Sequence, residues 1–147
     1  MDSPVLGSLL YSAAAAASYG LVGLVLLALG YVIIDLLTPG KLHELVWTQR
    51  NRGAVLVLGS SILAMGWIVR AAILSSASVL WLGLVSTLVY GVIGLVLMAV
   101  SFFLMDLLAP GKLGALIVDD DDRLHPAVWI TAATHVAVGL VVAAAIA

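Results

Sequence analysis

Residues 19–42 read YGLVGLVLLALGYVIIDLLTPGKL, and residues 90–113 read YGVIGLVLMAVSFFLMDLLAPGKL. At a separation of 71 residues (90 − 19), 14 of these 24 positions are identical. Shared apolar character would match leucine to leucine, but it would not also repeat Asp35 as Asp106 and the Pro-Gly-Lys-Leu that ends each stretch. The sequence therefore predicts a tandem duplication.

The composition indicates that lipid surrounds much of this chain. Of its 147 residues, 64% are hydrophobic and 10% are charged, and the mean hydropathy is +1.25. Soluble domains have about 45–50% apolar and about 25% charged residues. A net charge of −2 without a basic patch gives no electrostatic basis for binding nucleic acid. The absence of cysteine excludes disulfides, thiolate metal sites and thiol catalysis.

Four apolar stretches are long enough to cross a membrane, which takes about 20 residues. They cover residues 4–37, 54–74, 79–108 and 126–147, separated by loops at 38–53, 75–78 and 109–125. Each copy of the duplication holds two spans, so the second copy enters the membrane in the same orientation as the first. The predicted fold is an all-α membrane protein of four transmembrane helices. Two tandem parallel two-helix repeats, 1–74 and 75–147, together form one membrane domain.

The basic residues predict the orientation. Five of them lie in the two loops at one side of the membrane, namely Lys41, Arg50, Arg52, Lys112 and Arg123. Only Arg70 lies near the other side. Cytoplasmic loops are enriched in lysine and arginine, so loops 38–53 and 109–125 are expected in the cytoplasm, with both termini outside. The first helix is expected to be retained, because the segment before it lacks the positive charges of a signal peptide.

The first and third helices are longer than a bilayer requires, so they are expected to tilt or to protrude on the outer side. Each carries a small residue at every fourth position: Ser12, Ala16 and Gly20 on the first, and Gly83, Thr87 and Gly91 on the third. Small residues allow helix backbones to approach closely within a membrane. Two interpretations stay open, namely packing within one chain and packing between subunits.

The repeated motif Asp-Leu-Leu-[Thr/Ala]-Pro-Gly-Lys-Leu resembles that of the DUF350 family of bacterial inner-membrane proteins. It is carried here by two sets of residues, Asp35/Pro39/Gly40/Lys41/Leu42 and Asp106/Pro110/Gly111/Lys112/Leu113. Family members commonly open an even-numbered helix with asparagine, and Asn51 matches; residues 122–125 depart from that pattern. The resemblance covers nearly the whole chain. It implies a four-helix bacterial plasma-membrane protein and no particular activity.

Asp35 and Asp106 lie in the last turn of their helices, where the helix dipole disfavours a carboxylate. Each therefore needs a cation or a hydrogen-bond donor. One interpretation is an ion, proton or headgroup site. The other is a structural bond to Lys41, Arg52 or the returning backbone. The Pro-Gly pairs then turn the chain, and residues 41–46 are predicted to form a short interfacial helix whose lysine contacts solvent or anionic lipid.

His135 is expected near mid-membrane, with Thr131 and Gly139 one turn to either side. It is either a neutral histidine bonded to a neighbouring helix or part of a proton relay. A register shift of two residues beyond the loop pairs it with Ile62, which argues against a symmetric histidine pore. Arg70 is expected to extend outward to the headgroups or to bind an acidic partner.

No combination of residues indicates catalysis, a metal site or a cofactor. The favoured function is therefore a non-enzymatic, oligomeric assembly or scaffold module. Its expected partners are the lipid bilayer and further copies of itself or other membrane proteins. The alternative is an oligomeric ion or proton channel, or a small transporter, that uses Asp35, Asp106 and His135.

Overall fold

A computed structural model describes residues 3–37, 42–76, 79–108 and 124–147. Its elements are α1 (Ser3–Leu37), the π-helical turn η1 (Glu44–Thr48), α2 (Arg52–Leu74), α3 (Leu80–Leu108) and α5 (Pro126–Ile146). All four long helices have the length and hydropathy of membrane spans. The prediction of four transmembrane helices is confirmed, with ends within two residues of those expected. The described part of the chain contains no strand.

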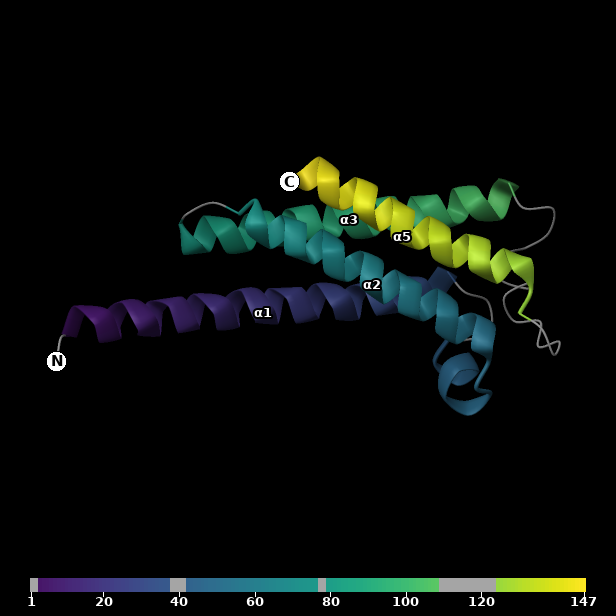
Figure 1. Cartoon of the computed structure of the whole chain (residues 1–147), viewed down its shortest axis with the longest axis horizontal. Helices are drawn as coiled ribbons and strands as arrows, with labels where there is room; N and C mark the ends of the chain where they lie inside the picture. Colours follow the sequence, from purple (N-terminus) through teal and green to yellow (C-terminus); the bar gives the residue numbers. More distant parts are fainter. Residues whose placement is uncertain (1–2, 38–41, 77–78, 109–123) are drawn as a thin grey trace.

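The four helices pack as one bundle in which α2 contacts α1, α3 and α5. The most extensive contact joins α2 and α5, which lie side by side (Figure 1). Small residues make this closeness possible: Ala64 on α2 is fully buried, and a Cβ added to Gly139 on α5 would lie 2.7 Å from the Cα of Ala64. Close backbone approach gives the dispersion contacts that hold helices together in lipid.

The amino-terminal half of α1 extends beyond the rest of the bundle (Figure 1). The Tyr19 hydroxyl lies 3.0 Å from the Ser76 hydroxyl, so Tyr19 is level with the connection between α2 and α3. The residues of α1 before Tyr19 therefore continue for about 24 Å past that level, at 1.5 Å per residue. Below it, Gly23, Leu26, Gly30 and Ile34 are buried against the bundle. The first helix therefore protrudes from the bundle, whereas its protrusion on the outer side of a membrane stays a prediction.

At the opposite end, which we call the η1 end, the chain reverses from η1 into α2. Leu42 and Leu45 are buried there, whereas His43 and Glu44 are exposed, as expected for an interfacial helix. The Asn51 N–H donates to the Leu45 carbonyl (2.9 Å), and the intervening Arg50 has φ 53°. A left-handed residue is the usual way to end a helix and turn the chain, but glycine normally supplies it.

Candidate functional site

The most distinctive polar feature of the described chain is a buried pair between α2 and α5. The Ser61 hydroxyl lies 2.6 Å from Nδ1 of His135, and both side chains are buried. Ser61 also donates to the Val57 carbonyl (2.7 Å). A serine hydroxyl has one hydrogen, so with that hydrogen on Val57 it must accept from Nδ1–H. Nε2 of the neutral imidazole is then a hydrogen-bond acceptor.

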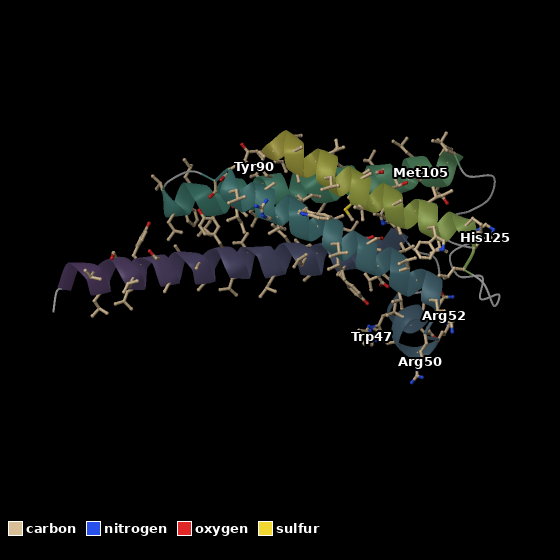
Figure 2. All side chains as sticks on the ribbon, in the orientation of Figure 1. Trp47, Arg50, Arg52, Tyr90, Met105 and His125 are labelled. Carbon is tan, nitrogen blue, oxygen red and sulfur yellow. The ribbon has the colours of Figure 1, made fainter. Side chains whose placement is uncertain are left out.

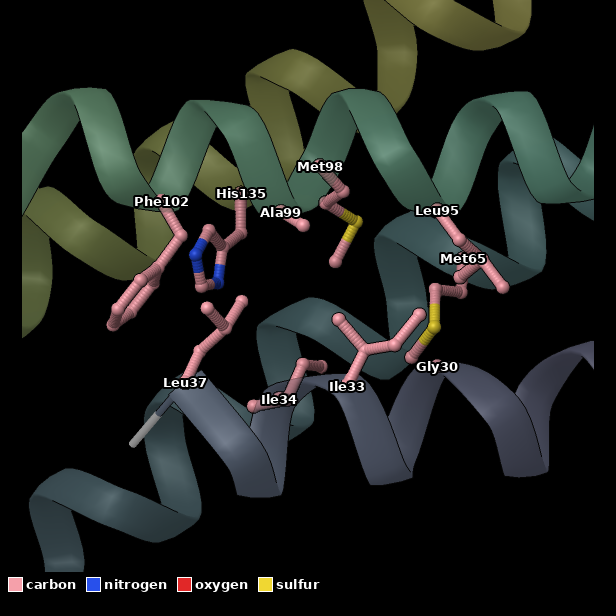
Figure 3. A pocket seen from close by; sticks show the side chains of 10 residues that line it. All are labelled: Gly30, Ile33, Ile34, Leu37, Met65, Leu95, Met98, Ala99, Phe102 and His135. Atoms are coloured by element: carbon pink, nitrogen blue, oxygen red, sulfur yellow. The ribbon is translucent and has the colours of Figure 1, made fainter. Parts of the chain in front are cut away.

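The other side of His135 faces a small apolar cavity of about 10 Å³ among α1, α2 and α3 (Figure 3). The Phe102 ring lies beside the imidazole, with its centroid 5.7 Å away and its plane inclined by 38°. Ile34 and Met98 line the cavity, and His135 is the only polar side chain among the residues that line it. Within the described chain, this cavity has room for about one water molecule at most and offers one hydrogen-bonding atom.

The structure places His135 against Ser61, the residue next to the Ile62 with which the sequence comparison pairs it. Ile62 is 42% exposed, whereas His135 is 2% exposed. The residue-by-residue pairing of the two halves stays a prediction. Sequence reasoning missed Ser61, although a serine beside small residues on an apolar helix is a recognisable signal for interhelical bonding.

The helices α2 and α5 both begin with a side-chain cap. Asn51 precedes α2, and its side chain accepts from the Ala54 N–H (2.8 Å). His125 precedes α5, and its Nδ1 accepts from the Ala127 N–H (3.1 Å). His125 therefore provides a cap within residues 122–125, the segment that departs from the asparagine of the family.

Asp35 is engaged at the η1 end. One of its carboxylate oxygens accepts from the backbone N–H of His43 (3.3 Å). A backbone donor of the returning chain is among the partners that the structural interpretation predicts. Asp106 is half-buried and also has an interaction partner. The ion-binding interpretation of both carboxylates stays a prediction.

The two stripes of small residues differ in their exposure. Gly83, Thr87 and Gly91 on α3 are buried within the chain, and a Cβ on Gly91 would meet the side chain of Leu26. Ser12, Ala16 and Gly20 on α1 are exposed, and a Cβ on Gly20 would meet nothing within 4 Å. Packing within the chain therefore accounts for the stripe on α3 but not for the stripe on α1.

Of the remaining predicted residues, the structure describes Arg70 only, and it lies apart from the buried pair. Arg70 is exposed near the end of α2 away from η1, and none of the described residues forms an ion pair with it. The following lie outside the described residues: Pro39, Gly40, Lys41, Pro110, Gly111 and Lys112. The described residues bring together no group of three or more potential metal ligands.

Comparison with known proteins identifies a family that spans the bundle. The family described as Domain of Unknown Function (DUF350) matches residues 6–146. A UPF0719 transmembrane protein of Mycolicibacterium paratuberculosis is 39% identical over 141 residues, which cover 96% of this chain and 92% of that protein. UPF0719 transmembrane proteins of Mycobacterium bovis and Mycobacterium tuberculosis are each 36% identical over 138 residues, covering 94% of this chain and 90% of theirs. No solved structure matches.

Proposed function

This chain belongs to the DUF350 family, and from that premise we propose that it is a membrane assembly module, not an enzyme, whose copies associate through the projecting half of α1. The observation that carries the proposal is the exposure of this half-helix. Its large apolar side chains are each about 60% exposed: Val5, Leu6, Leu9, Leu10 and Tyr11.

A bilayer matched to the shorter helices α2 and α5 would not reach this segment. With 23 and 21 residues, α2 and α5 are about 35 and 32 Å long, close to the hydrocarbon thickness of about 30 Å. Because Tyr19 is level with the end of α2, the preceding residues of α1 would then project past the hydrocarbon core. An apolar helix surface exposed to water is normally covered by another protein surface.

A second copy is the simplest partner for this surface. Every copy in the membrane presents the same half-helix on the same side, so projecting helices can cover one another by symmetric association. Ser12 and Ala16 are small and exposed there, which allows close helix packing. Gly20, at the base of the segment, has open space around it for an approaching helix.

The duplication is part of the same proposal. In the register of 74 residues, burial coincides between α2 and α5 as expected for two copies of one hairpin packed about a pseudo-two-fold axis. The coinciding buried pairs are Leu58 with Ala132, Ser61 with His135, Met65 with Gly139 and Ile68 with Val142. This agreement supports division of the chain into halves 1–74 and 75–147.

We further propose that the η1 end faces the cytoplasm of a bacterial cell and that both termini lie outside the plasma membrane. The chain has no cysteine, so single cysteines report topology without background. A membrane-impermeant maleimide should label Ala147→Cys in intact cells and His43→Cys only after permeabilisation. The reverse labelling pattern would show that the protein has the opposite orientation.

The transport alternative has less support. Asp35 accepts from the His43 backbone, and His135 is bonded to Ser61, so two of the three predicted path residues have identified local partners. If Asp35→Asn and Asp106→Asn preserved assembly but abolished cation or proton flux in liposomes, transport would replace the assembly proposal.

The decisive experiment is native mass spectrometry of the protein in nanodiscs. We expect an oligomer for the parent chain and a monomer for the variant Leu6→Ser/Leu10→Ser. The matched control is Leu24→Ser, because Leu24 is on the same helix and equally exposed, but lies level with the bundle. A monomeric parent would refute self-association. If Leu6→Ser/Leu10→Ser stayed oligomeric while Leu24→Ser dissociated, the interface between copies would instead lie at the level of the bundle, within the membrane.

A further inference from the structure

A groove on the outer surface of α2 and α5 begins at two arginines. Its volume at the η1 end is about 680 Å³, bounded by Arg50, Arg52, Gly59, Ile62, Leu63 and Trp129 among others. A second hollow of about 480 Å³ continues along α5 as far as Leu140. The two share Leu56, Ser60 and Trp129, so they form one trough that is cationic at one end and apolar along its length.

The dimensions of the trough are those of one leaflet. Arg52 and Leu63 are eleven residues apart on α2, and Trp129 and Leu140 are eleven apart on α5. Each interval is about 17 Å along a helix, a little over half of a hydrocarbon core of about 30 Å. A chain lying in the trough would therefore run from the membrane boundary to about the midplane.

The positive charge at the head of the trough is not neutralised by any carboxylate among the described residues, none of which forms an ion pair with Arg50 or Arg52. Arg52 is the first residue of α2, where the helix dipole disfavours a cation and favours an anion. Figure 2 shows Arg50, Arg52 and His125 at the same end of the molecule. Two arginines beside a helix start are suited to bind a negatively charged phosphate group.

The backbone at Arg50 adds an independent observation. Its φ of 53° lies in the left-handed region, which glycine adopts more readily than arginine. The turn itself requires only this conformation and not a guanidinium. Strained residues of this kind are concentrated at functional sites.

We propose that this trough binds an anionic phospholipid, with its phosphate between Arg50 and Arg52 and one acyl chain along α2 and α5. The missing side chain of Gly59 forms part of the wall, and a Cβ added there would meet nothing within 4 Å. The site does not depend on the oligomeric state of the protein.

Trp129 lies in the trough and can report the occupant. The reporter chain carries Trp47→Phe, Trp67→Phe and Trp81→Phe and is reconstituted in equimolar phosphatidylglycerol and phosphatidylcholine vesicles, with one lipid brominated at a time. We expect bromolipid quenching of Trp129 to show a preference for phosphatidylglycerol of up to about 30-fold. This follows from about 5-fold for each arginine near an anionic headgroup.

Three substitutions test the assignment. Arg52→Gln should reduce the preference about 5-fold. Arg50→Gly should reduce it similarly while preserving thermal stability, because glycine accepts the left-handed backbone. Gly59→Leu should fill the trough and decrease quenching by both lipids. The controls are Arg70→Gln and Gly66→Leu, because Arg70 lies toward the other end of α2 and Gly66 is open but outside the trough.

Several outcomes would overturn the proposal. Equal quenching by the two lipids would contradict the assignment of a headgroup site to the arginines. A preference for phosphatidylglycerol that persisted after both arginine substitutions would contradict it as well. Absence of quenching by either lipid would mean that protein, such as a second copy, covers the trough. Loss of the preference on adding inorganic phosphate would assign the arginines to a soluble anion.

Discussion

The contact between Gly139 and Ala64 allows a direct test of the packing between α2 and α5. A Cβ placed on Gly139 would lie 2.7 Å from the Cα and 3.1 Å from the carbonyl oxygen of Ala64. These are backbone atoms in the interior of a helix, so no side chain can rotate to make room. The substitution Gly139→Ala must instead push the two helices apart by up to about 1 Å. A gap of that size loses about a quarter to a half of each affected dispersion contact.

The expected cost follows from two opposing effects. Overpacking a well-filled site costs about 1–3 kcal/mol, whereas alanine stabilises a helix interior by about 1 kcal/mol relative to glycine. Gly66→Ala is the matched control, because Gly66 is a helical glycine on α2 whose added Cβ meets nothing within 4 Å. The helix-forming gain is common to both variants. The difference between them is therefore the steric cost alone, about 1–3 kcal/mol.

Reversible unfolding in mixed micelles with increasing sodium dodecyl sulfate, followed by circular dichroism, measures this difference. We expect Gly66→Ala to be at least as stable as the parent chain and Gly139→Ala to be less stable than Gly66→Ala. Equal free energies of unfolding for the two alanine variants would refute the reasoning, since the backbones would then not approach as closely as the contact requires.

Two further predictions concern polar contacts. A double-mutant cycle of Ser61→Ala and His135→Ala should give a coupling free energy of about 0.6–1.7 kcal/mol, the range for interhelical hydrogen bonds in membranes. The reason is that the Ser61 hydroxyl and His135 Nδ1 lie 2.6 Å apart. Additive effects of the two substitutions in the same unfolding assay would contradict this hydrogen bond. Asn51→Ala and His125→Ala should each lose about 1 kcal/mol of stability by leaving a helix start uncapped. An Asn51→Asp variant that retained stability while Asn51→Ala did not would separate capping from other roles of this side chain.

The sequence predicted the helices and their ends because hydropathy, length and capping are local properties. It could not predict which face of each helix packs, since helices that are apolar all round carry no strong periodic signal. Gly20 and Gly91 illustrate the difficulty: they occupy corresponding positions in the repeated motif, yet one is exposed and the other is buried against Leu26. The arrangement of the neighbouring helices determines which of the two glycines is buried.

Some contacts of the polar residues could likewise be predicted from the sequence, and others could not. A partner for Asp35 at the returning backbone was predictable from the position of the carboxylate in a last helical turn. The contact between Ser61 and His135 was not, because it depends on how α2 and α5 are rotated about their axes, and their apolar sequences do not specify that rotation. No sequence signal marks Arg50 as left-handed, since glycine or asparagine is the usual residue in that conformation.

The two proposed surfaces lie on different helices and at different levels, so each can be lost without the other. The projecting half of α1 lies beyond the level of Tyr19, and the trough runs from the η1 end along α2 and α5. Leu6→Ser/Leu10→Ser should therefore dissociate the oligomer and leave the preference of the trough for phosphatidylglycerol intact. Gly59→Leu should decrease the quenching of Trp129 and leave the oligomer intact. If one variant abolished both, the trough would lie in the contact between copies, and bound lipid would be part of the assembly.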